Sequence, residues 1–226
     1  MNNQIPRHIG FIVDGNRRWA KAKGLSINEG HRIGSKNLET IARACFSLGI
    51  PSVTFYVFST ENWKRSKREV NFLMNLFQRQ IHGYIKEFGK EGIRVNVIGE
   101  KDKLTKPIKN LIAQNQQNII KNIKGNLNLA LNYGGQEEIV SACQKLVQES
   151  KAINKENIKK NLYLADQPSV DLIIRTSGEV RLSGFLLWQS AYAEFYFSKK
   201  YWPAFTGKDL KTALRNYATR KRRFGK

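Results

Sequence analysis

Six short runs of apolar, β-branched and aromatic residues recur along this 226-residue chain, and longer helix-like stretches separate them. The runs occupy residues 9–13, 53–58, 95–98, 127–131, 170–174 and 194–197. Continuous apolar runs of this length are typical of strands that are buried on both faces. Their alternation with helical patterns predicts an α/β fold with a six-stranded, mostly parallel sheet flanked by helices.

The helical patterns fill the intervals between these runs. They cover residues 35–48, 69–88, 106–121, 136–150, 155–162, 185–192 and 208–219. Along residues 70–88, apolar side chains recur at helical spacing and form a broad stripe that belongs to a core by default. The sequence shows no internal repeat, low-complexity linker or break in composition, so we expect residues 1–226 to form a single domain.

The charge of the chain is strongly unbalanced. Lys and Arg number 39 against 18 Asp and Glu, which gives a formal net charge of +21. Such a chain attracts polyanions, whether nucleic acid, an anionic membrane surface or phosphorylated small molecules. A basic nucleic-acid-binding protein is therefore an alternative, but it would gather its basic residues on one face with stacking aromatics. Here the basic residues are spread along the sequence, and no nucleic acid partner is expected.

Other classes of protein fit the sequence poorly. No apolar run approaches the ~20 residues of a membrane-spanning helix, and residues 1–7 lack the apolar core of a signal peptide. Cys45 and Cys143 are far apart and lack a CxxC spacing, which disfavours a disulfide framework or a zinc site. We expect a cytoplasmic protein.

Polar clusters follow four of the six apolar runs directly. Residues 14–18 follow the first run, 59–65 the second, 132–135 the fourth and 175–179 the fifth. In a parallel α/β sheet, ligands bind in the crevice at the carboxyl ends of the strands, where these clusters would converge. Loops rich in Gly, Ser and Asn that lead into helices suit anions, because free backbone N–H groups point at the ligand.

The side chains in these clusters indicate a phosphorylated ligand and a divalent metal. Planar guanidinium groups that match phosphate oxygens come from Arg17, Arg18, Arg65, Arg175 and Arg181. Asp14 and Glu194 could hold a Mg²⁺ that bridges a diphosphate. Neither the G-x-x-x-x-G-K-[ST] nor the G-x-G-x-x-G nucleotide loop occurs, which favours a substrate other than a nucleotide.

Taken in order, these segments resemble the cis-prenyltransferases, a family that includes undecaprenyl diphosphate synthase. The resemblance covers residues 14–19, 30–31, 58–65, 132–135, 175–183, 185–194 and 220–225. It implies a hydrophobic tunnel opening at the strand ends, a homodimer, and Mg²⁺ as cofactor. It also implies condensation of isopentenyl diphosphate with an allylic diphosphate to give a Z-polyprenyl diphosphate. The expected allylic substrate is farnesyl diphosphate, and the expected product is undecaprenyl diphosphate.

The resemblance also implies roles for individual residues. Asp14 would bind Mg²⁺ and assist departure of the diphosphate, Glu194 would complete the metal site, and Asn62 would accept a proton. The allylic diphosphate would lie against Gly15, Asn16, Arg17, Arg18 and His31, with Trp19 beside it. Ser59, Thr60, Glu61 and Trp63 would line the reacting centre, and Arg65, Arg175, Arg181, Leu182 and Ser183 would surround the isopentenyl diphosphate.

The sequence departs from the family pattern at three informative positions. Ile27 stands where many bacterial members carry an arginine, and Val180 where some carry a histidine metal ligand. Val57 is bulkier than the alanine of long-chain bacterial members, so a short- or medium-chain Z-prenyl diphosphate is an alternative product. The basic surface is compatible with peripheral contact to anionic lipid, where a polyprenyl product must go.

Overall fold

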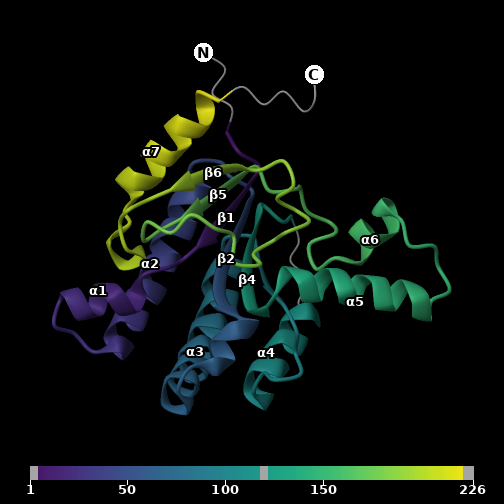
Figure 1. The fold of residues 1–226 in the computed structure, drawn as a ribbon, viewed down its shortest axis with the longest axis horizontal. Coiled ribbons are helices and arrows are strands. Elements are labelled where there is room, and N and C mark those ends of the chain that lie inside the picture. Colours follow the sequence, from purple (N-terminus) through teal and green to yellow (C-terminus); the bar gives the residue numbers. More distant parts are fainter. Residues whose placement is uncertain (1–4, 118–121, 221–226) are drawn as a thin grey trace.

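The computed structural model describes residues 5–117 and 122–220, which fold around one six-stranded, all-parallel sheet (Figure 1). The strand order is β3-β4-β2-β1-β5-β6. The strands are β1 (His8–Ile12), β2 (Ser52–Ser59), β3 (Ile93–Ile98), β4 (Gly125–Tyr133), β5 (Leu172–Arg175) and β6 (Glu194–Phe197). All six predicted runs are strands, and the prediction of an α/β fold with a flanked parallel sheet is confirmed.

Helices connect the strands, and Figure 1 shows α5 and α6 at the end of the molecule away from α1. The α-helices are α1 (Asn16–Ala22), α2 (Ile27–Ser47), α3 (Lys67–Lys90), α4 (Lys106–Gln117), α5 (Gly135–Gln148), α6 (Lys155–Asn161) and α7 (Gly207–Ala218). Two short 3₁₀ helices are η1 (Thr60–Lys64) and η2 (Trp202–Ala204). The part of the third predicted helical stretch (residues 106–121) beyond residue 117 lies outside the described residues. No helix in the described part of the chain is long and apolar enough to cross a membrane.

Alternate residues of the central strands point to two separate layers of core. On one face, Phe11 and Phe55 stack with ring centroids 4.9 Å apart, and Trp202 packs against both rings. On the other face, Tyr56 stacks on Phe185 at 4.8 Å. Because side chains alternate along a strand, the four central strands β1, β2, β4 and β5 are covered on both faces, whereas the edge strands β3 and β6 are only partly buried. This double burial explains why the runs of these four strands are largely apolar.

The register places the loops after β1, β2 and β5 at one edge of the sheet. Ile12, the last residue of β1, is paired with Tyr56 of β2 and with Arg175 of β5. Residues that follow these strands therefore emerge side by side, although those at the ends of β1 and β5 are about 160 positions apart in the sequence.

The beginning of α2 differs from the prediction by eight residues, and α1 was not predicted. Ser26 caps α2 by accepting a hydrogen bond from the Glu29 backbone N–H, and the Glu29 side chain returns the bond. The start of α2 is not apparent from the sequence, because Gly30 and Gly34 lower the helix propensity of this segment. A Cβ on Gly30 would lie 2.5 Å from the carbonyl oxygen of Asn16, so these glycines let α1 pack closely on α2. His31 is consequently inside the helix rather than before it.

The helix predicted for residues 185–192 is absent, and the segment is a series of turns. Ser183, Gly184 and Leu186 adopt positive φ values of 50°, 78° and 44°, which a right-handed helix cannot contain. The Phe185 ring fits against the sheet where a Cβ on Gly10 would stand 2.8 Å from it. Packing of Phe185 against the strands thus overrides the helical pattern of the sequence.

A buried histidine at the start of β1 makes stability depend on pH. His8 is fully buried, and its ring nitrogens lie 2.8 Å from the Pro168 carbonyl oxygen and 2.7 Å from the Thr54 hydroxyl. Burial lowers the pKa of His8 from 6.5 to about 4. Between these pH values the unfolded chain binds a proton at this position and the folded chain does not, so acid favours unfolding.

The His8 contribution to the free energy of unfolding should therefore be constant above about pH 6.5 and fall on acidification towards pH 4. The expected loss from this residue between pH 7 and pH 5 is about 2 kcal/mol. Denaturant unfolding of the wild type and of His8→Gln at both pH values measures it, and the variant should lose less stability on acidification. His82→Gln, at an exposed position of α3, is the matched control. Equal acid sensitivity in wild type and His8→Gln would contradict the prediction.

Candidate active site

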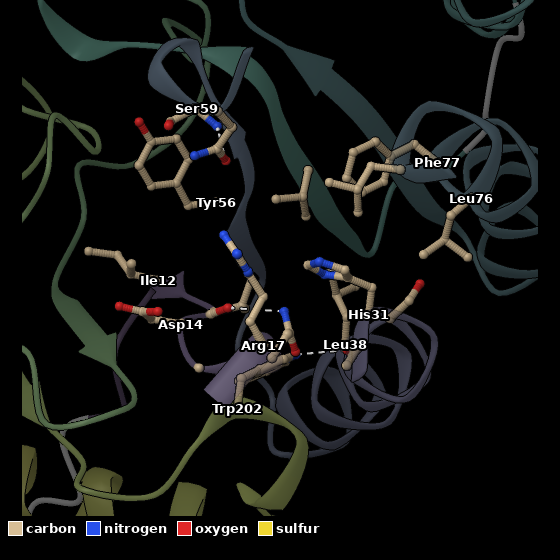
Figure 2. A pocket seen from close by; sticks show the side chains of 18 of the residues that line it. Ile12, Asp14, Arg17, His31, Leu38, Tyr56, Ser59, Leu76, Phe77 and Trp202 are labelled. Atoms are coloured by element: carbon tan, nitrogen blue, oxygen red, sulfur yellow. Dashed lines mark hydrogen bonds between the residues drawn. The ribbon is translucent and has the colours of Figure 1, made fainter. Parts of the chain in front are cut away.

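A cavity of about 1070 Å³ opens at the carboxyl edge of the central strands (Figure 2). Its lining combines polar side chains from the loops after β1, β2 and β5 with apolar side chains from α3 and β4, among them Leu73 and Leu131. Figure 2 shows Leu76 and Phe77 across the cavity from Asp14 and Ile12. The space can therefore accept a ligand with a charged end and an apolar end.

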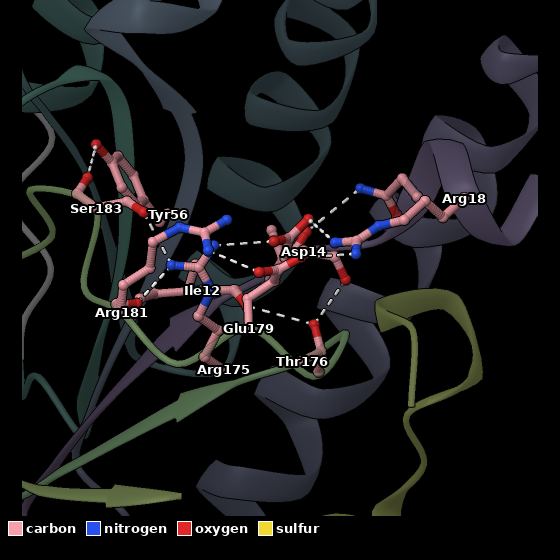
Figure 3. Close-up of polar contacts among 11 residues, drawn as sticks. Ile12, Asp14, Arg18, Tyr56, Arg175, Thr176, Glu179, Arg181 and Ser183 are labelled. Carbon is pink, nitrogen blue, oxygen red and sulfur yellow. Dashed lines mark hydrogen bonds and ion pairs between the residues drawn. The ribbon is translucent and has the colours of Figure 1, made fainter. Parts of the chain in front are cut away.

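Asp14 lies at the polar end of the cavity and joins two groups of cations (Figure 3). Its Oδ2 accepts a hydrogen bond from Nη2 of Arg175 at 3.0 Å, and its Oδ1 accepts one from Nη2 of Arg18 at 3.2 Å. The Asp14 carbonyl oxygen accepts hydrogen bonds from the Thr176 hydroxyl at 2.7 Å and the Trp202 backbone N–H at 3.0 Å. Backbone and side chain of Asp14 are thus both fixed, while the side chain remains 29% exposed.

Arg175 is the most deeply placed cation of the site. Its side chain is 5% exposed, and Nη1 donates to the Ser183 hydroxyl at 2.9 Å and to the Arg181 carbonyl oxygen. The positive φ values of residues 183 and 184 fold this loop back towards β5, which brings Ser183 to the guanidinium. Nε of Arg175 is buried without a hydrogen-bond partner among the described residues.

Glu179 balances the two more exposed arginines. Its carboxylate accepts hydrogen bonds from Arg18 at 2.8 Å and from Arg181 at 2.6 Å (Figure 3). These bonds, that from Arg181 first, lower the pKa of Glu179. Together Asp14 and Glu179 pair with three arginines and leave one positive charge in excess, and an incoming polyanion would compete with these carboxylates for the same guanidinium groups.

A second polar cluster surrounds the buried carboxylate of Glu69, at the start of α3. Oε1 of Glu69 lies 3.2 Å from Nε2 of His31 and accepts a hydrogen bond from Nη1 of Arg65 at 3.2 Å, and Arg17 lies 3.9 Å from the other oxygen. The Glu69 side chain is 9% exposed. It therefore holds side chains from α1, α2 and the loop after β2 around one point. The sequence places Glu69 in a helix and predicts no role for it in the site. Its position four residues after Arg65 is nevertheless a spacing at which an Arg–Glu ion pair can form.

Burial lowers the pKa of His31, and the nearby charges of Arg65 and Arg17 lower it further, whereas the hydrogen bond to Glu69 opposes the shift. His31 is consequently mostly neutral at pH 7. A neutral imidazole has one ring N–H, and the contact with the Glu69 carboxylate, which can only accept, places that N–H on Nε2.

The loop after β2 is shaped by its own side chains. Oδ1 of Asn62 accepts a hydrogen bond from the Ser59 backbone N–H at 3.1 Å, which closes the first turn of η1. Nε1 of Trp63 donates to Oδ1 of Asn132 at 2.6 Å, so the Trp63 ring is tied to the end of β4. Ser59 and Asn62 face the cavity as a result.

The structure brings most of the predicted site residues to the cavity. Those that line it are Asp14, Gly15, Asn16, Arg17, Arg18, His31, Ser59, Glu61, Asn62, Arg65, Arg175 and Ser183. The predicted residues outside the lining are Trp19, Thr60, Trp63, Arg181, Leu182 and Glu194. Of these, Arg181 is still linked to the network through Glu179, and Leu182 packs against the core cluster that contains Phe185.

Within this chain Glu194 lies at the other edge of the sheet from Asp14, unlike the prediction that both lie at one edge, and its role as a metal ligand stays a prediction. Glu194 begins β6 and is in register with Leu172 and, through it, with Ile9 at the start of β1. The Glu194 carboxylate instead accepts a hydrogen bond from Nη1 of Arg220 at 2.6 Å. Because the strands are parallel, the first residue of β6 lies at the amino edge of the sheet, a strand length away from Asp14.

A family model described as "Putative undecaprenyl diphosphate synthase" matches residues 12–225. The chain thus belongs to the cis-prenyltransferase family, and it is a transferase of prenyl groups. It is 44% identical to an isoprenyl transferase of Clostridium perfringens over 232 residues, covering 100% of this chain and 92% of the relative. It is 47% identical to the chloroplastic nerylneryl diphosphate synthase CPT2 of Solanum lycopersicum over 229 residues, covering 98% of this chain and 71% of the relative.

Two solved structures share the fold. The lavandulyl diphosphate synthase of Lavandula x intermedia, in complex with dimethylallyl diphosphate, superposes with a TM-score of 0.88 at 35% identity, covering 98% of both chains. A probable undecaprenyl diphosphate synthase from Campylobacter jejuni superposes with a TM-score of 0.83 at 31% identity, covering 100% of both chains.

The Glu69 cluster leads to a test by substitution. Glu69→Gln removes the charge that orients Arg65 and that opposes the lowering of the His31 pKa. The orientation of Arg65 and the pKa of His31 should therefore change together. We expect the His31 pKa to fall further, as read from the titration of its imidazole protons by NMR. We also expect kcat/KM for prenyl transfer to fall by roughly 10- to 100-fold.

Glu87→Gln is the matched control, because Glu87 lies on the same helix, is half exposed and pairs with Lys90 at the surface. It should alter neither quantity. A wild-type rate in Glu69→Gln would show that Arg65 and His31 hold their positions without this carboxylate.

Proposed function

We propose that this protein condenses isopentenyl diphosphate with an allylic diphosphate to give a Z-polyprenyl diphosphate. The observation that carries the proposal is the cavity itself, where arginines gathered around Asp14 open onto an apolar wall from α3 and β4. Both substrates are amphiphiles with a diphosphate head and a prenyl tail. A cavity with one cationic end and one apolar end is complementary to such molecules.

The two sides of Asp14 supply two diphosphate subsites. On one side, Arg17, Arg18 and His31 come from α1 and α2 and would hold the allylic diphosphate, next to Gly15 and Asn16. On the other side, Arg175 and Ser183 are hydrogen-bonded to each other and would hold the isopentenyl diphosphate, with Arg181 and Arg65 near it. Bidentate guanidinium contacts favour this use, since they match the geometry of phosphate oxygens.

Asp14 is the residue best suited to a Mg²⁺ ion. Mg²⁺ in phosphate sites is held by one or two carboxylates, with substrate oxygens and water completing the octahedron. Asp14 is partly exposed and stands between the two groups of cations, which meets that requirement with a single carboxylate. No group of three or more metal-binding side chains gathers anywhere in residues 5–117 and 122–220, so substrate oxygens would supply most of the ligands. Bound there, the ion would neutralise charge on the leaving diphosphate.

The proposed chemistry begins with the allylic C1–O bond, which breaks and leaves its electron pair on the departing diphosphate. Arg17 and Arg18 stabilise the negative charge that develops, because they are already oriented before the bond breaks. The isopentenyl double bond forms the new C–C bond to the allylic C1. Loss of one proton, for which Asn62 is the proposed acceptor, creates the new Z double bond. The growing chain then extends along the apolar wall, which would form the tunnel.

Farnesyl diphosphate as primer and undecaprenyl diphosphate as product are part of the proposal. Support for this primer and product comes from the family description, which names an undecaprenyl diphosphate synthase, and from the solved structure of a probable undecaprenyl diphosphate synthase. The alternative is a short- or medium-chain product, which the nerylneryl and lavandulyl diphosphate synthases among the relatives support. Product analysis with dimethylallyl, geranyl and farnesyl diphosphate as primers separates the two.

We further propose that the protein acts in the cytoplasm as a homodimer, with peripheral contact to anionic membrane. The dimer is supported by family resemblance, and the membrane contact by the net charge of +21 and the lipid nature of the product. Gel filtration and co-sedimentation with anionic vesicles test the two parts separately.

Asp14→Asn tests the assignment of the site. The amide keeps a hydrogen-bond acceptor for Arg175 or Arg18 but removes the charge that would hold Mg²⁺, so kcat should fall by about 10²- to 10³-fold. Incorporation of labelled isopentenyl diphosphate into extractable polyprenyl product measures the rate. Asp166→Asn is the control, because Asp166 is a 65% exposed carboxylate that also pairs with an arginine. Prenyl transfer that survives in Asp14→Asn would remove Asp14 from the mechanism, and tight, salt-sensitive RNA binding without turnover would favour the nucleic-acid alternative.

Val57 tests the control of product length. Its side chain lines the cavity at the end of β2, where extra bulk would stop a growing chain early. Val57→Ala should shift the product distribution towards longer chains, as resolved by reversed-phase chromatography of the dephosphorylated products. Val147→Ala, which removes the same atoms from a 64% exposed position on α5, should leave the distribution unchanged. An unaltered distribution in Val57→Ala would dispose of the hypothesis.

A further inference from the structure

Lys21 is a cation at the cavity that no carboxylate compensates. It lies in the last turn of α1 and lines the cavity together with Arg17, four residues earlier on the same helix. Residues four apart share one face of a helix, so both side chains project towards the same space. Among residues 5–117 and 122–220, Lys21 forms neither an ion pair nor a side-chain hydrogen bond.

The other cations of the lining are all engaged. Arg18 and Arg175 pair with Asp14, Arg65 pairs with Glu69, and Arg17 lies 3.9 Å from Glu69. Each of them would share its donors between a carboxylate and a substrate oxygen, or exchange one for the other, when a diphosphate binds. Lys21 has no such exchange to make, so its interaction with an anion would add to binding without the loss of an internal pair.

The wall next to Lys21 offers no competing charge. After α1, the rim of the cavity continues through Leu25 and Ile27, which are 37% and 40% exposed and also line the space. His31 stands one turn further along α2, with a lowered pKa that leaves it neutral near pH 7. On this side of the cavity Lys21 is therefore a permanent positive charge beyond Arg17, and an ammonium on a flexible stem can follow a phosphate group.

We propose that Lys21 is a further binding residue for the allylic diphosphate, and that it contacts the head group from α1 where Ile27 supplies no charge. The inference rests on the proposed function for the identity of the ligand. Lys21 would bind a phosphate oxygen directly, and it would not contact the isopentenyl diphosphate, which the Arg175 side of Asp14 would hold.

The test is the Kd for farnesyl diphosphate alone, measured by quenching of tryptophan fluorescence in the absence of isopentenyl diphosphate. Lys21→Met should weaken binding by about tenfold, the value of one charge-assisted hydrogen bond. Lys21→Arg should bind close to the wild type, and the KM for isopentenyl diphosphate should be the same in all variants. Ile27→Arg in the Lys21→Met background should recover part of the affinity, because it places a charge on the same wall.

Lys23→Met is the matched control. Lys23 caps the same helix, is exposed and is not part of the cavity lining, so binding should not change. Lys21 also lies where a cation favours the helix dipole, and a purely structural role would lower the melting temperature and raise both KM values together. A lower melting temperature with both KM values raised would overturn the proposal. So would an unchanged Kd in Lys21→Met, or no recovery of affinity in the double variant. Because the binding measurement requires no turnover, absence of prenyl transfer in the wild type would refute the proposed function without deciding the role of Lys21.

Discussion

The ion pair between Asp14 and Arg175 joins the ends of two adjacent strands, and the organisation of the site follows from it. Arg175 is the last residue of β5 and Asp14 follows β1 by two positions, so the parallel pairing of these strands fixes the distance between the two side chains. The guanidinium is almost fully buried, and a buried cation requires a partner. Asp14 supplies it and remains accessible on the side that faces the cavity.

The remaining polar groups are arranged around this pair as alternating charges. Asp14 and Glu179 separate Arg175, Arg18 and Arg181, and Glu69 separates Arg17 from Arg65. Without the carboxylates, these cations would repel one another across a space that is partly closed to water. The carboxylates therefore keep the arginines in place before a polyanion binds, which is the preorganisation that electrostatic catalysis requires.

Two close contacts between elements make this arrangement possible. Gly30 and Gly34 let α1 lie against α2, which brings Arg17 and His31 to the same cavity from different helices. Phe185 fills the space above Gly10, and the loop before it turns back so that Ser183 reaches Arg175. In the first case a helix forms through glycines that local propensity disfavours, and in the second a predicted helix is replaced by turns. In both cases the gain is the position of a charged or polar group.

The strands, the long helices and the gathering of polar loops at one edge could be read from the residues alone, because burial on two faces imposes continuous apolar runs and parallel strands place their ends together. Asp14, Arg17, Arg18 and Arg175 were predicted at this edge in this way, and they line the cavity, whereas the role of Asn62 came from the family resemblance. The early start of α2, the turns at residues 185–192, the role of Glu69 and the distance of Glu194 from Asp14 were not. These depend on contacts between segments far apart in sequence, where packing against a neighbour outweighs local propensity and strand register decides which edge of the sheet a residue occupies.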